Sequence, residues 1–317
     1  MTTVAPTGSS AIALPGADGR PSSVRIWVMA ARLRTLPAAI APVLVGTSLA
    51  LGAGHLHPLA FLAALLGAIF IQVGTNLSND YSDARRGADT EERLGPVRVT
   101  AGGLAPPRQV LTATYVSFGL AILCGAYLVA VAGWELIAVG AASILAGVLY
   151  TGGPRPYGYE GLGEVFVFLF FGVVAVVGSY FVQVQQLPWQ AFGCAVPVGL
   201  LASAILVVNN VRDIDTDRRA GKRTLAVRLG RARTRDLYTA MLATAFLSAP
   251  VLWLLGMYPW LLLCWLSTPL AIALVRVVRT RLDGPSLNGA LARTGALQLL
   301  FCLLLSAGIL AGGGIGG

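Results

Sequence analysis

Long apolar runs constrain this chain more than any other feature. Nine can be read in the sequence, at 37–54, 58–79, 109–131, 134–151, 163–183, 190–209, 237–255, 258–277 and 294–312. Such runs match the thickness of a bilayer, and inside lipid a single segment satisfies its backbone only as a helix. Charged residues make up 12% of the chain, about half of the roughly 25% found in soluble proteins. The sequence predicts an all-α integral membrane protein with nine transmembrane helices in a single bundle.

Basic residues gather on one side of this predicted topology. They lie in or beside the alternate loops 1–36, 80–108, 152–162, 210–236 and 278–293, whereas the opposite loops contain no Lys or Arg. Loops rich in Lys and Arg stay in the cytoplasm. We therefore expect a multi-pass protein of the cell membrane, with a cytoplasmic N-terminus and the C-terminus on the opposite side. The net charge of +9 is explained by topology, so no nucleic-acid partner is implied.

The N-terminal segment of the chain differs in composition from the rest. Residues 1–24 are rich in Ser, Pro, Gly and Ala and lack a continuous apolar stretch. They are predicted to be a disordered cytoplasmic tail and not a cleaved signal peptide. Residues 25–317 are predicted to form one transmembrane domain.

Two polar motifs interrupt the apolar pattern, and each closes a long run. The first starts at Asn76 and contains Asp80 and Asp83, and the second starts at Asn209 and contains Asp213 and Asp217. The shift that carries Asp80 onto Asp213 superimposes Asn, Asp, Arg and Arg of the two motifs. Acidic residues at the end of a membrane helix are costly without a counter-ion, so they usually mark a functional site.

Helical spacing arranges each motif as a ladder of one amide and two carboxylates. Asp80 and Asp83 are three residues apart, and Asp213 and Asp217 are four apart, so each pair is expected to share a helix face. An even number of spans separates the motifs, which places both on the cytoplasmic face. Four carboxylates facing one another suit Mg²⁺, a hard cation that binds carboxylates together with substrate phosphates. We therefore predict Asp80, Asp83, Asp213 and Asp217 as metal ligands.

Cationic and amide side chains around the motifs are the natural partners of a phosphate. Lys222 is the only lysine of the chain and follows the second motif directly. Arginine holds phosphate or carboxylate through paired hydrogen bonds, whereas lysine acts as a point charge. Ordinary anchoring at the membrane surface is the alternative for any single arginine. The predicted catalytic set is Asn76, the four aspartates and Lys222, and the predicted substrate-binding residues are Arg34, Asn79, Arg86, Tyr150, Arg155, Asn209, Asn210 and Arg212.

A third polar cluster fills the loop between the fourth and fifth spans. It runs from Tyr150 to Glu164 and carries three tyrosines among glycines and prolines. An aromatic belt at the membrane surface would look similar. Because the tyrosines are concentrated in one loop, we expect them to face a substrate.

These residues resemble the UbiA superfamily of intramembrane prenyltransferases. Asn79-Asp80-Tyr-Ser-Asp83 and Asp213-Ile-Asp-Thr-Asp217 match its two Asp motifs, and the resemblance extends over about 26–312. The third Asp of the family's first motif would fall at Gly87, and an Asp stands instead at Asp89. This pattern is similar to the naphthoate branch of menaquinone biosynthesis.

The resemblance implies a Mg²⁺-dependent aromatic prenyltransferase. Its substrates would be a polyprenyl diphosphate and 1,4-dihydroxy-2-naphthoate, and its products demethylmenaquinone, CO₂ and diphosphate. Arg34, Arg155 and Lys222 are candidates to hold the carboxylate of the acceptor. Other acceptors of the superfamily, such as 4-hydroxybenzoate or homogentisate, stay open. A secondary transporter is the alternative from another class, although its site would be expected near the middle of the bilayer.

Overall fold

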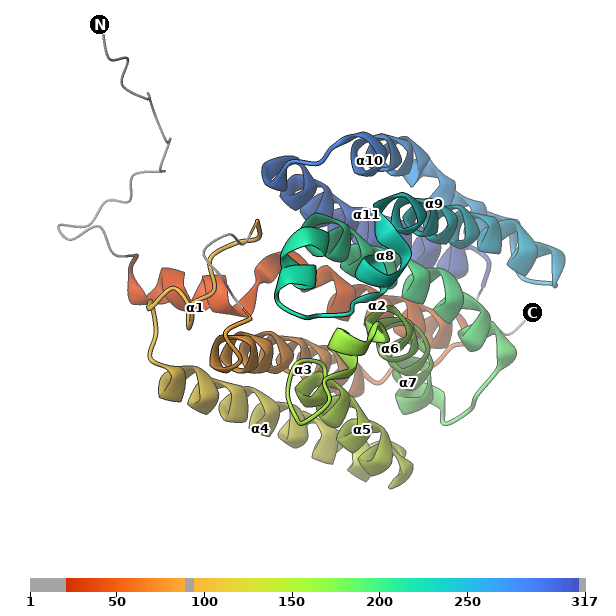
Figure 1. The fold of residues 1–317 in the computed structure, drawn as a ribbon. Coiled ribbons are helices and arrows are strands. Elements are labelled where there is room, and N and C mark those ends of the chain that lie inside the picture. The colour runs from red at the N-terminus through yellow and green to blue at the C-terminus, as the bar shows by residue number, and fades with distance from the viewer. Residues whose placement is uncertain (1–20, 89–93, 314–317) are drawn as a thin grey trace, which may run out of the picture.

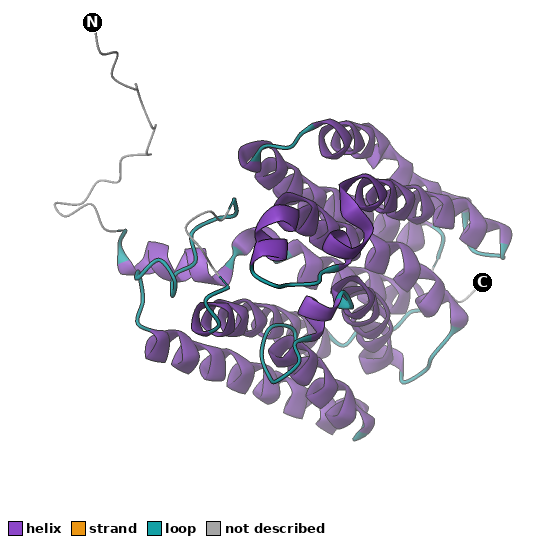
Figure 2. Ribbon diagram, in the orientation of Figure 1, coloured by secondary structure: helices purple, strands orange, loops and turns teal. Residues whose placement is uncertain are grey.

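The computed structural model describes residues 21–88 and 94–313, and every regular element in these ranges is helical (Figures 1 and 2). The principal helices are α1 (Ser23–Ala31), α2 (Pro37–Gly52), α3 (Pro58–Arg85), α4 (Pro107–Ala132), α5 (Glu135–Leu149), α6 (Gly163–Val167), α7 (Ala175–Val184), α8 (Trp189–Arg219), α9 (Leu225–Leu254), α10 (Thr268–Thr280) and α11 (Gly284–Ala311). A π-helical stretch, Phe168–Val174, joins α6 to α7, and a 3-10 helix, Pro259–Ser267, leads into α10. The predicted all-α membrane fold is confirmed.

The predicted number of nine spans is not confirmed. Within the described ranges, seven helical segments are long and apolar enough to cross a membrane, and an eighth is obtained if Ser23–Thr35 and Pro37–Gly52 form one span bent by 52°. The remaining predicted span, 134–151, corresponds to α5. This helix has only 15 residues, about 22 Å of rise, against a hydrocarbon core of about 30 Å.

The N-terminal prediction lies mostly outside the described residues, since these begin at Pro21. The last residues of the predicted disordered tail are helical, because α1 already begins at Ser23. The side chain of Ser22 accepts a hydrogen bond from the backbone N–H of Arg25 at 3.4 Å, which caps the first turn. Asp89, which the sequence offers in place of the family's third Asp, also lies outside the described residues.

Proline and capping side chains fix where several helices begin. Proline occupies the first turn of α2, α3 and α4, where its missing N–H costs nothing. Thr224 caps α9 by accepting from the N–H of Val227 at 3.4 Å, and Asp283 caps α11 by accepting from that of Ser286 at 2.8 Å. Both caps lie on the side of the molecule that carries the polar loops.

Helix α8 forms the centre of the bundle. Most of its apolar stretch is buried inside the protein, more than for any other candidate span. It packs against α9 and α11, and against the π-helical stretch through Gly172 and Gly199. A Cβ added at Gly172 would lie 2.6 Å from the Cα of Gly199, so only glycine permits this close approach. Buried α8 thus provides a rigid base for the polar motif at its end.

Candidate active site

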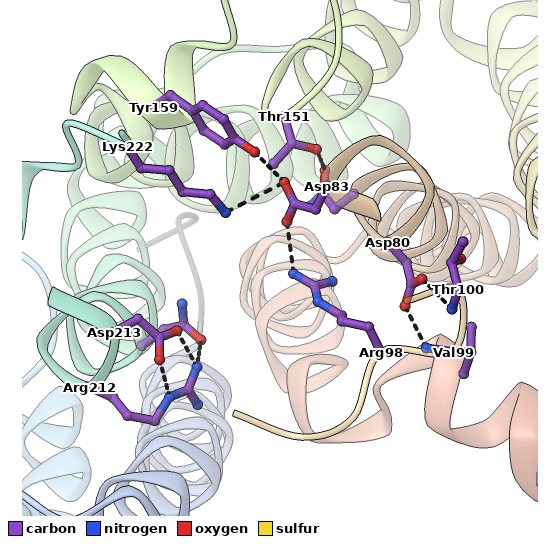
Figure 3. Close-up of polar contacts among 12 residues, drawn as sticks. Asp80, Asp83, Arg98, Val99, Thr100, Thr151, Tyr159, Arg212, Asp213 and Lys222 are labelled. Atoms are coloured by element: carbon purple, nitrogen blue, oxygen red, sulfur yellow. Dashed lines mark hydrogen bonds and ion pairs between the residues drawn. The ribbon is translucent and has the colours of Figure 1, made fainter. Parts of the chain in front are cut away.

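Both polar motifs line one large cavity between the helices. Its volume is about 1020 Å³, and its wall is mostly apolar. One part of the wall is polar and comes from the ends of α3 and α8 and from the loops beside them (Figure 3). The polar side chains of this part are Asn76, Asn79, Asp83, Arg98, Tyr150, Thr151, Tyr159, Asn209, Asn210, Asp213, Asp217, Lys222 and Thr224.

Asp83 at the end of α3 is held by side chains from three separate loops. The Tyr159 hydroxyl donates a hydrogen bond to its Oδ1 at 2.6 Å, Arg98 donates to its Oδ2 at 3.1 Å, and Lys222 Nζ lies 3.6 Å from Oδ1 (Figure 3). Lys222 also lies 4.7 Å from the centre of the Tyr159 ring, a cation–π contact. Asp83 is 1% exposed, so its charge is balanced almost entirely by these protein groups.

Asp213 at the end of α8 is held by its sequence neighbour. Arg212 donates to both carboxylate oxygens, from Nε at 2.7 Å and from a terminal nitrogen at 2.5 Å (Figure 3). The same guanidinium donates to Asn209 Oδ1 at 2.8 Å and to Asn288 Oδ1 at 2.6 Å. Four hydrogen bonds and near-complete burial make Arg212 a clamp on Asp213. It does not line the cavity among the residues described, so the predicted contact with substrate is not supported.

Asn288 is a partner that the sequence did not reveal. It lies on α11, accepts from Arg212, and donates from Nδ2 to the carbonyl oxygen of Leu94 at 2.9 Å. It therefore connects the second Asp motif to the loop that follows the first. No local sequence pattern marks it, because its two partners are 76 and 194 residues away.

Asp80 does not lie with the other three predicted metal ligands. Its two oxygens accept from the backbone N–H groups of Val99 at 3.1 Å and Thr100 at 2.9 Å (Figure 3). It is buried and is absent from the cavity wall. Successive residues turn by about 100°, so a separation of three leaves about 60° between two side chains. This angle is enough to direct Asp83 to the cavity and Asp80 to the loop.

The placement of Asp80 corrects the predicted alignment of the motifs. The cavity-facing pairs are Asn79 with Asp83 and Asn209 with Asp213, each four residues apart. They superimpose when Asp83 is aligned with Asp213, whereas the predicted alignment placed Asp80 there. In this corrected register Gly87 takes the place of Asp217, so the carboxylate is present in one motif only.

The predicted amides and Tyr150 lie on the cavity wall. Asn79 Oδ1 accepts from the Thr151 hydroxyl at 2.9 Å, and Asn210 Nδ2 donates to Glu164 Oε1 at 2.9 Å. Asn76 Nδ2 donates to the Ala31 carbonyl and to the Thr35 hydroxyl, both at 3.0 Å. These bonds fix the amides in position.

Three predicted substrate-binding arginines lie outside the cavity wall. Arg34 and Arg155 are exposed, and Arg86 is exposed with a hydrogen bond to the Gly153 carbonyl. The cations that line the cavity are Arg32, Arg98 and Lys222. Sequence position alone could not separate these groups, since all of them lie near the same membrane surface.

An aromatic ladder leads from the polar end of the cavity into its apolar part. Tyr150 meets Tyr157 edge-on at 5.5 Å, Tyr157 stacks on Phe166 at 4.0 Å, and Phe166 lies 6.1 Å from Phe170. All four rings line the cavity. Burial raises the pKa of the Tyr157 phenol, which stays neutral and donates to the Ala146 carbonyl at 2.8 Å. The ladder thus offers π faces to an apolar or cationic ligand.

The donor set of the cavity suits a hard cation. Asp83, Asp213 and Asp217 provide carboxylate oxygens, and Asn79 and Asn209 provide amide oxygens, which are the ligands that Mg²⁺ prefers. No three His, Cys, Asp or Glu side chains in the described ranges are close enough together to form a metal centre on their own. Such a spread set fits an ion that is bound jointly by protein and phosphate.

Comparisons with known proteins agree with this geometry. The model of the UbiA prenyltransferase family matches residues 39–293. The 1,4-dihydroxy-2-naphthoate octaprenyltransferase of Mycobacterium tuberculosis is 46% identical, over 90% of this chain and 97% of the relative. That of Escherichia coli K12 is 38% identical, over 91% of this chain and 96% of the relative.

The fold is shared with a solved structure. A UbiA homolog from Archaeoglobus fulgidus, bound to DMAPP and Mg²⁺, superimposes with a TM-score of 0.62. The match covers 88% of this chain and 99% of the homolog, at 15% sequence identity. Since the family model spans most of the sequence and close relatives match nearly end to end, this chain belongs to the UbiA prenyltransferase family.

Proposed function

We propose that this protein transfers a polyprenyl group from polyprenyl diphosphate to 1,4-dihydroxy-2-naphthoate, releasing CO₂ and diphosphate and forming demethylmenaquinol, the reduced form of demethylmenaquinone. The observation that carries the proposal is the two-part cavity, with acids, amides and cations at one end and an apolar wall beyond. A polyprenyl diphosphate has the same division, between a charged head and a hydrocarbon tail. The names of the relatives from Mycobacterium tuberculosis and Escherichia coli favour the naphthoate acceptor.

The polar end of the cavity is the proposed site of the diphosphate. Arg98 and Lys222 already flank Asp83, and both line the cavity, so they can neutralise phosphate oxygens. Mg²⁺, held by Asp83, Asp213 and Asp217 with the amides, would stabilise the negative charge that grows on the leaving diphosphate. The predicted role of Asp80 is replaced by a structural one, holding the 99–100 backbone beside the site.

The reaction then depends on the apolar wall. As the bond from carbon to the diphosphate oxygen breaks, the allylic carbon becomes cationic, and the ring carbon that bears the carboxylate attacks it. Loss of CO₂ returns an electron pair to the ring, so the reaction balances without an external proton and yields the hydroquinone. The predicted product demethylmenaquinone forms from it only by a later two-electron oxidation. Tyr150, Tyr157 and Phe166 present π faces that stabilise positive charge, and the apolar surroundings exclude water.

The topology supports a location in the cell membrane. Loops that carry most basic residues flank the polar end of the cavity. By the positive-inside rule we place this end and the N-terminus in the cytoplasm and the C-terminus on the other side. Residues 25–317 act as one transmembrane domain in this proposal.

The test is an assay of membranes that contain the protein, with a prenyl diphosphate, Mg²⁺ and a panel of aromatic acceptors. We expect prenylation of 1,4-dihydroxy-2-naphthoate with release of labelled CO₂ from its carboxyl group, and loss of activity with EDTA. Turnover of 4-hydroxybenzoate or homogentisate, with none of the naphthoate, would overturn the acceptor assignment. Full activity in EDTA would overturn the need for a divalent cation.

A further inference from the structure

Gln72 is a polar side chain that follows a long apolar stretch of α3. It is the first polar residue of α3 counted from Pro58, and it lies 11 positions before Asp83. At 1.5 Å per residue this separation is about 16 Å along the helix. Gln72 is 7% exposed and lines the cavity together with Ala68 and Ile71 of the same helix. It therefore lies where the polar end of the cavity gives way to its apolar part, deeper in the bilayer than the carboxylates.

The hydrogen bonds of Gln72 leave its carbonyl oxygen without a partner. Its Nε2 donates to the Thr35 hydroxyl at 2.9 Å, whereas Oε1 is buried and has no partner among the described residues. The Thr35 oxygen also accepts from Asn76 at 3.0 Å and donates its one proton to the Arg32 carbonyl at 2.9 Å. Because Thr35 has no further proton to give, exchanging the two ends of the amide would not satisfy the oxygen. The network thus fixes Oε1 as the unpartnered end.

An unpartnered carbonyl in an apolar environment reduces stability unless a ligand supplies a donor. Gln298 on α11 gives a useful contrast, since its Oε1 is also buried without a partner among the described residues. Gln298 is not part of the cavity wall, whereas Gln72 is. Gln72 differs from Gln298 because it lies on the cavity wall, where a bound ligand could donate a hydrogen bond to its carbonyl oxygen.

The chemistry of the two proposed substrates selects the ligand. At neutral pH a diphosphate group presents mainly hydrogen-bond acceptors, and a prenyl tail presents neither donors nor acceptors. Only the aromatic acceptor carries phenolic O–H groups on a flat, largely apolar body. The 1-hydroxyl of the acceptor is adjacent to the carboxylate and can donate to it internally, which leaves the 4-hydroxyl as the free donor. Resting on the proposed function, we infer that Gln72 Oε1 accepts a hydrogen bond from the 4-hydroxyl of the acceptor, and that Gln72 determines the requirement for this hydroxyl.

This contact would orient the acceptor in the reaction. A hydroxyl that donates to a carbonyl becomes more electron-rich and passes density into the ring, which favours attack on the allylic cation. Arg32 lines the same cavity, and its backbone carbonyl is joined to Gln72 through the Thr35 hydroxyl, which fixes the position of the amide.

The experiment compares two acceptors in three proteins. The acceptors are 1,4-dihydroxy-2-naphthoate and 1-hydroxy-2-naphthoate, which lacks one hydroxyl, and the proteins are wild type, Gln72→Met and the matched control Gln298→Met. Wild type and Gln298→Met should prefer the dihydroxy acceptor to the same degree. Gln72→Met should lower kcat/KM for the dihydroxy acceptor by roughly 10- to 100-fold, with little change for the other acceptor and less than about twofold change in KM for the prenyl diphosphate.

Each outcome decides a separate question. If Gln72→Met keeps the wild-type preference for the second hydroxyl, or if both glutamine variants lose it equally, the inference is wrong. Should Gln72→Met not accumulate in membranes, Gln72→Asn, which shortens the side chain by one methylene, undergoes the same comparison and is expected to lose the preference. Failure of wild type to prenylate any naphthoate would overturn the proposed function instead.

Discussion

The two Asp motifs of this protein use one spacing and two different kinds of support. Asp83 at the end of α3 is balanced by Arg98, Lys222 and Tyr159, which come from three loops. Asp213 at the end of α8 is balanced by Arg212, the residue before it on the same helix. One half of the site is therefore assembled from distant segments, and the other is built into a buried helix. Two motifs can therefore share the same spacing, although one needs distant segments of the chain for its support and the other needs only its own helix.

The largest expected effect tests whether both halves are needed for catalysis. Asp83→Asn and Asp213→Asn should each lower prenyl transfer on the order of 100- to 1,000-fold, because each removes a charge that faces the diphosphate site. The measurement is kcat/KM in membranes. Asp215→Asn is the matched control, since Asp215 is 61% exposed and pairs with Arg218 and Arg231 at the surface. Similar losses in all three variants would contradict the special position of the cavity-facing pair.

Among the variants considered, loss of the Arg212 clamp on Asp213 should lower the free energy of unfolding most. Arg212→Met leaves the buried Asp213 carboxylate and two amide oxygens without their donor, and we expect it to lower the free energy of unfolding by about 3–5 kcal/mol. Thermal unfolding in detergent measures this loss. Arg218→Met, at a side chain that is 59% exposed, should change stability by less than about 0.5 kcal/mol. Equal stability of the two variants would show that α8 does not depend on the clamp.

Asp80 distinguishes the two alignments of the motifs. With its oxygens bound to the N–H groups of Val99 and Thr100, Asp80→Ala should lower stability by roughly 1–3 kcal/mol and leave the Mg²⁺ concentration for half-maximal activity unchanged. Asp83→Asn should raise that concentration. A Mg²⁺ requirement that rises as much for Asp80→Ala as for Asp83→Asn would restore the alignment of Asp80 with Asp213.

The smallest expected effect concerns the link between the two halves. Asn288→Asp keeps an oxygen for Arg212 and loses the donor to the Leu94 carbonyl, so it should cost about 1 kcal/mol. Asn288→Leu removes both bonds and should cost more than Asn288→Asp. Unfolding of the two variants under one set of conditions provides the comparison, and the reverse order would contradict the double role of Asn288.

The sequence predicted the helical membrane fold and most of the polar residues at the charged end of the cavity, because hydropathy and helical spacing are local properties. Asn79, Asp83, Asp213 and Asp217 all line the cavity, as expected from their places at helix ends. The roles of Asp80 and Arg212 were not predictable, because each depends on which groups lie within hydrogen-bonding distance of the side chain in the folded protein. Asp80 meets the backbone of the loop that follows α3, and no periodic pattern encodes the path of that loop.

The arginines also show that the sequence does not predict which side chains face the cavity. Arg34, Arg155 and Arg98 all lie near the predicted cytoplasmic surface, yet only Arg98 lines the cavity. Composition and topology locate a charge to within a membrane face, whereas hydrogen bonding requires it to be located within about 3 Å. The predicted count of nine spans is not confirmed for a related reason, since α5 is largely apolar but too short to be counted by length.

The bond from Asn288 to Leu94 has a consequence for the order of events during biosynthesis. It joins residues 194 positions apart, and Asn288 lies on α11, which leaves the ribosome after α3 and α8. Helices α3 and α8 can enter the membrane much earlier, but the shared support of their motifs is incomplete until α11 arrives. The finished arrangement of the site thus depends on translation through α11, and a chain that stops before α11 would lack it.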